Sequence, residues 1–192
     1  MARPADRRAS YEDVLRAPAD KVAEVIDGEL VLSPRPAMPH AAAATALSEE
    51  LGPPFKRGRG GPGGWIILYE PEVHLARDIV VPDLGGWRRE TMGSIPNEPY
   101  VTIRPDWVCE VLSPATERFD RGNKIALYAR AGVAHVWLVN PLQRTLEVLR
   151  LSAERPEQWW TMGVFRDDAK VTAEPFAVFE LDLSVLWADV QL

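Results

Sequence analysis

The chain has 192 residues, of which 46% are hydrophobic and 26% are charged, and its formal net charge is −6. This composition predicts one globular domain with a hydrophobic core of its own. No apolar run reaches about 18 residues, which excludes a membrane-spanning helix. The single cysteine, Cys109, excludes an internal disulfide framework and a cysteine-based zinc site.

The first ten residues are rich in Ala and Arg but lack the apolar core of a secretion signal. We therefore expect a disordered tail over 1–10, a single domain over 11–192 and a cytoplasmic location. The negative net charge does not by itself favour nucleic-acid binding, although local patches of basic residues matter more than the net charge.

The first third of the chain contains two helix signals and one hairpin signal. A short helix is predicted over 11–15, with Ser10 as its cap. Two alternating runs, 22–26 and 29–33, flank Asp-Gly, which is a strong signal for a two-residue β-hairpin. An Ala-rich helix follows over 40–51.

The rest of the chain is richer in strand signals. Glycines and prolines predict a loop over 53–64, two prolines predict irregular structure over 88–104, and a helix is predicted over 119–131. The strand signals cover 65–69, 72–75, 79–84, 107–112, 135–140, 145–151 and 159–165, and a short strand with one helical turn lies within 176–187. This order predicts a mixed α/β or α+β domain, with a central mixed β-sheet flanked by helices.

Two carboxylates interrupt these strand signals. Asp83 ends an apolar run, where it either caps a loop or serves a site. Alternation along 107–112 places Glu110 between Val108 and Leu112 on one face of a strand that is apolar on both faces. A carboxylate in that position needs a cation, a raised pKa or an arginine partner. Together the two acids indicate a divalent-cation site.

Four further side chains are candidates for the same site. Lys124 lies on the inward face of the predicted helix 119–131, or else extends along the surface, and Asp120 one turn earlier could pair with it. Glu24 lies in the middle of a strand, either as a third acid near the metal or as a charge that protects a sheet edge. His40 either caps its helix or faces the site.

Several spaced segments over about 11–190 resemble the PD-(D/E)XK nuclease superfamily, and within it the Uma-type family of "putative restriction endonucleases". The segments that carry the resemblance are Glu24 to Val31, Ser33-Pro34 leading to His40, Val81 to Leu84, Pro105 to Thr116, Asp120 through Lys124 to Tyr128, and Ala131 to Pro141.

The resemblance implies a restriction-endonuclease-like fold in which Asp83 and Glu110 bind the metal. The superfamily lysine would lie two residues after the acid, where this chain has Leu112, so Lys124 is interpreted as a relocated lysine. Glu24 corresponds to the acid that the subfamily carries on its first strand. Gly85-Gly86 replaces bulky apolar residues, and we expect it to loosen the strand after Asp83.

The function that follows is a metal-dependent endonuclease that hydrolyses phosphodiester bonds of DNA. Mg²⁺ or Mn²⁺ would be held by Asp83, Glu110 and the backbone carbonyl of Val111. Lys124 would position the attacking water, and Glu24 would hold an outer water or a second metal ion. A homodimer is expected because cutting two strands needs two sites. The alternatives are a non-catalytic interaction module that retains the nuclease fold, and a hydrolase such as a glycosidase with two carboxylates.

Overall fold

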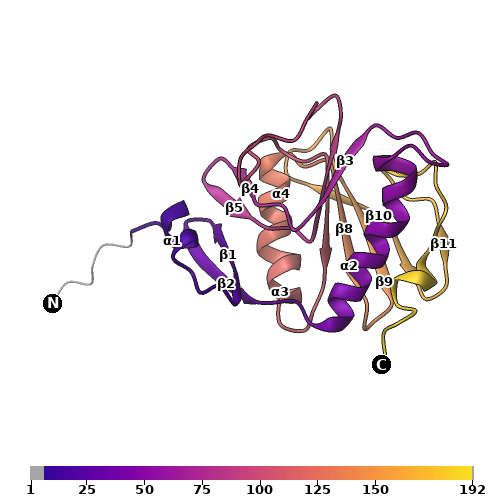
Figure 1. The fold of residues 1–192 in the computed structure, drawn as a ribbon, viewed down its shortest axis with the longest axis horizontal. Helices are drawn as coiled ribbons and strands as arrows, with labels where there is room; N and C mark the ends of the chain where they lie inside the picture. The colour runs from indigo at the N-terminus through magenta and orange to yellow at the C-terminus, as the bar shows by residue number, and fades with distance from the viewer. Residues whose placement is uncertain (1–6, 192) are drawn as a thin grey trace.

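The structure is a computed structural model that describes residues 7–191, so the part of the predicted disordered tail that covers 1–6 lies outside the described residues. Its centre is a six-stranded sheet in the order β10-β9-β8-β7-β6-β3 (Figure 1). Strands β7 and β8 are parallel, and every other neighbouring pair in this sheet is antiparallel. The strands are β3 Trp65–Tyr69, β6 Leu84–Arg88, β7 Trp107–Val111, β8 His135–Asn140, β9 Thr145–Leu151 and β10 Trp159–Arg166.

A second, four-stranded sheet lies beside the first in the order β2-β1-β5-β4. Its strands are β1 Lys21–Ile26, β2 Glu29–Pro34, β4 Val73–Leu75 and β5 Asp78–Val80. Strands β1 and β2 form the predicted hairpin, and Asp27 and Gly28 both adopt positive φ in its turn. The predicted short helix is α1 Tyr11–Leu15, where Ser10 and Asp13 form a capping box.

Two helices cover opposite faces of the six-stranded sheet (Figure 1). Helix α2 Met38–Leu51 packs on one face through Leu47 and Leu51, as predicted for an Ala-rich amphipathic helix. Helix α4 Ile125–Ala131 packs on the other face through Leu127 and Tyr128. The helical run that leads into α4 consists of α3 Glu117–Phe119 and a π-helical segment, η2 Asp120–Lys124.

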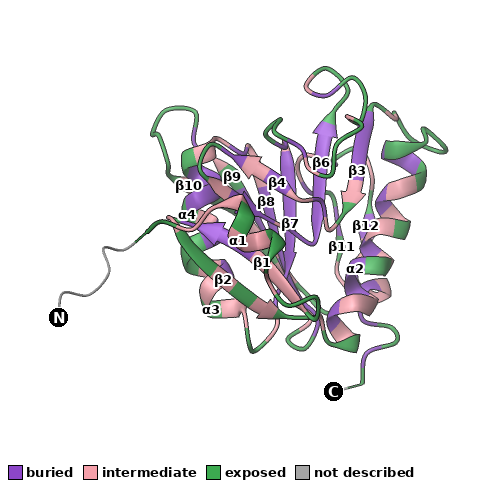
Figure 2. Ribbon diagram, turned by 60° about the vertical axis from the view of Figure 1, so that its left-hand side comes forward, coloured by how far each residue is buried: buried purple, intermediate pink, exposed green. Residues whose placement is uncertain are grey.

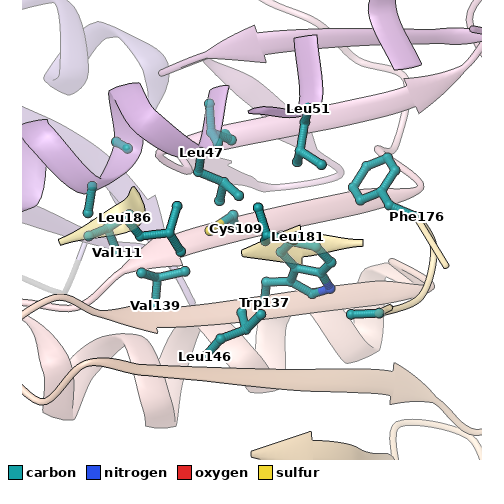
Figure 3. Close-up of a cluster of buried hydrophobic side chains, with 14 of the residues drawn as sticks. Leu47, Leu51, Cys109, Val111, Trp137, Val139, Leu146, Phe176, Leu181 and Leu186 are labelled. Carbon is teal, nitrogen blue, oxygen red and sulfur yellow. The ribbon is translucent and has the colours of Figure 1, made fainter. Parts of the chain in front are cut away.

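The C-terminal segment completes the α2 side of the core. It contains β11 Lys170–Val171, β12 Leu181–Asp182 and a 3₁₀ turn, η3 Leu183–Leu186. Phe176 from this segment lies 4.5 Å from Phe55 and 5.0 Å from Trp107, measured between ring centroids. Leu181 and Leu186 pack with α2 against the sheet (Figure 3).

Strand β7 is buried along its whole length, as its two apolar faces predict (Figure 2). Trp107, Cys109 and Val111 belong to the core under α2, whereas Val108 belongs to the core under α4. Because side chains alternate along a strand, Glu110 is directed toward the α4 side together with Val108.

The prediction of one continuous strand over 79–84 is wrong, and the difference determines where Asp83 lies. The run is divided between β5 and β6, which belong to different sheets, and residues 81–83 connect them. Asp83 therefore lies at the junction of the two sheets, directly before β6.

Gly85 and Gly86 do not loosen the following strand, as the sequence had led us to expect. Both are buried within β6, which pairs with β3 on one side and β7 on the other. A Cβ atom on Gly86 would lie 2.9 Å from the Trp107 ring, so the glycine allows the close approach of an aromatic side chain.

The segment over 53–64 also differs from the predicted loop. Residues Gly52–Lys56 continue α2 as a π-helical segment, η1, and only the residues after it form a loop. Within residues 7–191, the helices are all too short or too polar to cross a membrane.

Candidate active site

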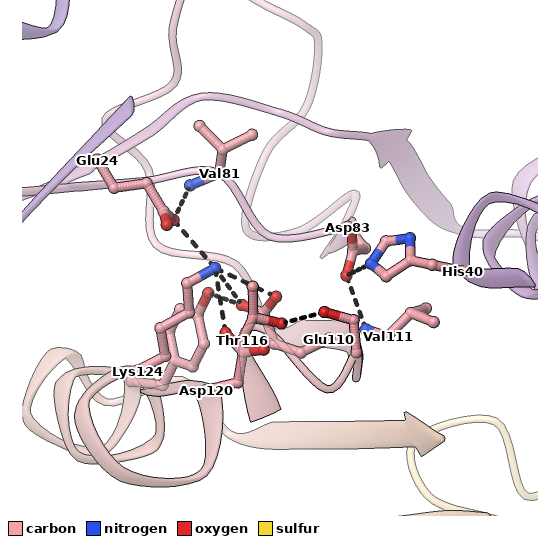
Figure 4. Close-up of polar contacts among 11 residues, drawn as sticks. Glu24, His40, Val81, Asp83, Glu110, Val111, Thr116, Asp120 and Lys124 are labelled. Carbon is pink, nitrogen blue, oxygen red and sulfur yellow. Dashed lines mark hydrogen bonds and ion pairs between the residues drawn. The ribbon is translucent and has the colours of Figure 1, made fainter. Parts of the chain in front are cut away.

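A pocket of about 260 Å³ opens where the two sheets meet. It is lined by residues from β1, the connection from β2 to α2, the crossing between β5 and β6, the end of β7, and the helical run before α4. All six side chains that the sequence nominated line it: Glu24, His40, Asp83, Glu110, Asp120 and Lys124. Figure 4 shows them directed toward one another from these separate elements.

Asp83 is oriented by two contacts to one of its oxygens. The backbone N–H of Val111 donates a hydrogen bond of 2.7 Å to Oδ2. The Nε2 atom of His40 lies 3.1 Å from the same oxygen. Both contacts, from α2 and from the end of β7, thus hold the Asp83 carboxylate at the edge of the pocket. These contacts come from Val111 and His40, which are distant from Asp83 in the sequence, so Asp83 does more than cap its own loop.

Glu110 is almost completely buried, with 2% of its surface exposed. Tyr128 donates its hydroxyl hydrogen to Oε1 over 2.5 Å, and Lys124 donates to Oε2 over 3.3 Å. Burial raises the pKa of Glu110 well above its usual range, and the Lys124 ammonium acts in the opposite direction. No arginine pairs with Glu110 among the described residues, so the expected alternative of a buried arginine pair is wrong.

Lys124 is a buried cation, with 6% of its surface exposed, rather than a surface lysine. Its Nζ lies 3.0 Å from Glu24, 3.3 Å from Glu110 and 3.8 Å from Asp120. Burial by itself lowers the pKa of Lys124, but these carboxylates outweigh it and the pKa lies well above the ordinary value. The ammonium is therefore charged at neutral pH.

Glu24 is buried in the interior of a sheet, because β1 has β2 on one side and β5 on the other. The alternative of an edge-strand charge is therefore wrong. One oxygen, Oε1, both accepts a 2.8 Å hydrogen bond from the Val81 N–H and lies 3.0 Å from Lys124. Glu24 thus connects the small sheet to the lysine of the helical run.

His40 and Asp120 occupy the margins of this group. His40 is 7% exposed and faces Asp83 instead of capping α2. Its buried Nδ1 atom has no hydrogen-bond partner among residues 7–191. Asp120 is buried beside Lys124, as the sequence suggested. Burial raises the pKa of Asp120, and Lys124 partly offsets this effect.

The pocket contains more anionic than cationic groups. Five acidic residues and two basic residues line it. Within residues 7–191, no three or more His, Cys, Asp and Glu side chains are already grouped in a way that could hold a metal ion. Carboxylate oxygens are nevertheless the ligands that Mg²⁺ prefers, and Mg²⁺ is often held by one or two carboxylates with several waters. The donor set of Asp83 and Glu110 fits a cation of this kind.

Three features of the site were not predicted as parts of it. The Tyr128 hydroxyl contacts Glu110, and its position four residues after Lys124 on the inward helix face was the signal that could have identified it. The Val81 N–H orients Glu24, and the side of the pocket contains Arg35. Neither of these carried a local sequence signal, because both depend on which segments become neighbours.

A mixed sheet with a helix on each face and a hairpin sheet beside it defines a restriction-endonuclease-like fold, and the acids and lysine meet where this fold joins its two sheets. The family model Uma2, described as "Putative restriction endonuclease", matches residues 9–185. The chain belongs to this family.

One solved structure supports the fold. It is described as a "putative nuclease belonging to DUF820" from Anabaena variabilis ATCC 29413 and superimposes with a TM-score of 0.71. It is 23% identical in sequence, and the match covers 94% of this chain and 98% of that one. A comparison with curated proteins found no match.

Proposed function

We propose that this protein is a metal-dependent endonuclease that hydrolyses phosphodiester bonds of DNA. The observation that carries the proposal is the convergence of two acids and a lysine from three elements in one pocket, with Lys124 Nζ 3.3 Å from Glu110. Membership of a family described as restriction endonucleases supports the same reaction class.

The proposed ligands of Mg²⁺ or Mn²⁺ are Asp83, Glu110 and the backbone carbonyl of Val111. Bound there, the ion would neutralise phosphate charge and favour deprotonation of the attacking water. Burial raises the pKa of Glu110, and a metal ion bound beside this carboxylate would favour its ionised form.

The side chains have distinct roles in the hydrolysis. The oxygen of water bonds to phosphorus, one P–O ester bond breaks, and the products are a phosphate monoester and a free hydroxyl that takes a proton. Lys124 would stabilise the negative charge that develops on the phosphate and would orient the water. Glu24 would hold Lys124 in place and contact an outer water or a second metal ion. Asp83 keeps its orientation through the Val111 N–H.

The decisive experiment compares carboxylate variants with matched surface controls. Asp83→Ala and Glu110→Ala should abolish cleavage of DNA in Mg²⁺ or Mn²⁺ while circular dichroism shows an intact fold. Asp168→Ala and Glu180→Ala remove exposed acids outside the pocket and should cut like the parent. Activity retained in both pocket variants would overturn the assignment.

Calorimetry separates this proposal from the non-catalytic alternative. A nuclease of this kind should bind Mn²⁺ through the pocket, and Asp83→Ala should lose that binding. An interaction module has no need of a metal, so the absence of Mn²⁺ binding in the parent protein would favour the module.

We also propose a homodimer as the working form. The support is an apolar surface on the edge strand β10, where Trp160 is 47% exposed, Met162 43% and Val164 48%. Exposed apolar groups on an edge strand commonly mark contacts between chains. Light scattering of the parent and of Trp160→Lys tests this, because a dimer through β10 should dissociate in the variant.

A further inference from the structure

The side chains proposed to act on phosphate are largely buried and line one pocket. Glu24 and Glu110 are each 2% exposed, Lys124 is 6% exposed and Asp83 is 9% exposed. The pocket volume of about 260 Å³ lies just below the range of roughly 300–1,000 Å³ that is usual for small-molecule sites. A phosphate must therefore enter the pocket to reach these groups, since only a small part of each is exposed.

Two short connections form the sides of the pocket. The end of β2 and the connection over 35–37 lead into α2, and residues 113–116 lie in the connection from β7 to the helical run that begins with α3. Prolines at 34, 36 and 114 restrict the backbone of both connections. The pocket is thus bounded by stiff segments.

The chemistry of the lining suits one nucleotide better than a stretch of duplex. Small apolar side chains and prolines line the sides, and they would contact the face of a sugar or base. The charged groups include five acids and only two basic residues, Arg35 and Lys124. Duplex DNA carries one negative charge per roughly 1.7 Å of its axis, so several phosphates near this lining would meet mainly carboxylates.

The shape of B-form DNA leads to the same conclusion. Its major groove alone is about 12 Å wide, and the stacked, paired strands cannot bend one phosphate inward without the rest of the helix. Enzymes that do chemistry on a base inside a pocket use single-stranded substrate or take the nucleotide out of the stack. An unpaired strand can turn a single phosphate toward Lys124.

From this geometry we propose that the pocket accepts a nucleotide of an unpaired strand, either single-stranded DNA or a single-stranded flap, and rejects intact duplex. The inference rests on the proposed nuclease function and specifies its substrate class. It requires one pocket for each cut, so it does not depend on the dimer.

The test uses one labelled DNA sequence in three forms with Mn²⁺: a single strand, a full duplex, and a duplex with a single-stranded flap. The single strand should be cut at least tenfold faster than the duplex, and the flap substrate should be cut within its unpaired part. Equal or faster cutting of the duplex would overturn this inference while leaving the nuclease proposal intact. If none of the three is cut, both proposals fail.

A second experiment narrows the pocket itself. Ala115 is an exposed residue that lines the pocket, so Ala115→Trp should obstruct entry and lower kcat/KM on the single strand at least tenfold. Ala153→Trp places the same bulk on an exposed site outside this pocket and should leave kcat/KM unchanged. Unchanged cutting by Ala115→Trp, or an equal loss in both variants, would contradict entry through this opening.

Discussion

The two faces of strand β7 are buried to the same degree but contain opposite chemistry. On the α2 face, Cys109 contributes to an apolar core with Trp107, Trp137 and Phe176, whose ring centroids lie 5.0–5.5 Å apart. On the α4 face, the neighbouring residue Glu110 contacts a lysine and a tyrosine hydroxyl. Both faces exclude water, but the α4 face does so with ionisable groups as well as apolar ones.

The difference between the two faces of β7 separates the part of the core that stabilises the fold from the part that carries the proposed site. Burying a large apolar side chain contributes about 1.5–3 kcal/mol, so the α2 face is a source of stability. Buried charges lose the favourable solvation that they have in water. Their mutual attraction offsets this loss only when the geometry is good. The α4 face is therefore costly, and a proposed role on phosphate gives a physical reason for four acids around one lysine.

The largest effect is expected from removing the cation of the charged face. Lys124→Met would leave Glu24, Glu110 and Asp120 without their shared partner, and it should lower the free energy of unfolding by about 3–5 kcal/mol at neutral pH. It should also abolish cleavage. Urea unfolding and a cleavage assay measure the two effects.

The control for this change is Lys170→Met, which removes an exposed lysine and should alter neither quantity. Adding Glu24→Gln to Lys124→Met should restore part of the lost stability, because it removes one of the unpaired charges. Stability equal to the parent in Lys124→Met would show that the carboxylates do not depend on the ammonium.

A cavity on the apolar face should have a large effect on stability alone. Leu47 is fully buried under α2, and Leu47→Ala should cost about 2–5 kcal/mol of unfolding free energy. Cleavage per folded molecule should stay at the parent level, since Leu47 does not line the pocket. A loss of kcat measured well below the unfolding midpoint would mean that the two faces are not independent.

His40 offers a sharper test of the proposed metal site. Its ring reaches from α2 to Asp83, which is a proposed metal ligand. His40→Ala should weaken Mn²⁺ binding about tenfold, as is usual when the partner of a metal-binding carboxylate is lost, and His40→Gln should recover part of it. Calorimetry without substrate measures both. His74→Ala, outside the pocket, is the matched control, and an equal loss in His40→Ala and His40→Gln would argue against orientation of Asp83 by a donor.

The smallest effect concerns pH. Burial raises the pKa of Asp120 in the folded protein above its ordinary value of 3.8. Its contribution to stability is therefore complete below that value and is lost as pH rises through the folded-state pKa. The parent should lose unfolding free energy relative to Asp120→Asn over this interval, which urea unfolding at several pH values would detect. A difference that is constant with pH would contradict the shift.

Local patterns were sufficient for most of the elements. The hairpin around Asp27-Gly28, the helix that ends at Leu51, and the alternation along β7 all depend on neighbours within a few residues, and each was confirmed. The strand and helix signals around Asp83, Glu110 and Lys124 were enough to nominate them together. These features were predictable because periodicity and turn geometry act over short stretches of chain.

Other features depended on contacts between distant segments. The division of the run 79–84 between two sheets, the burial of Gly86 beneath Trp107, and the interior position of β1 became visible only once the sheets were paired. The same holds for the Tyr128 hydroxyl on Glu110 and for the meeting of residues 33–37 and 113–116 around one pocket.

The sequence by itself thus determined which chemical groups this protein carries and on which local elements they lie. Only the tertiary structure decided that they are buried together in one pocket, which oxygen of Asp83 accepts from the Val111 N–H, and which segments line the pocket. The physical reason is that burial and pocket shape arise from packing between segments far apart in the chain, and no local window of sequence contains both partners of such a contact.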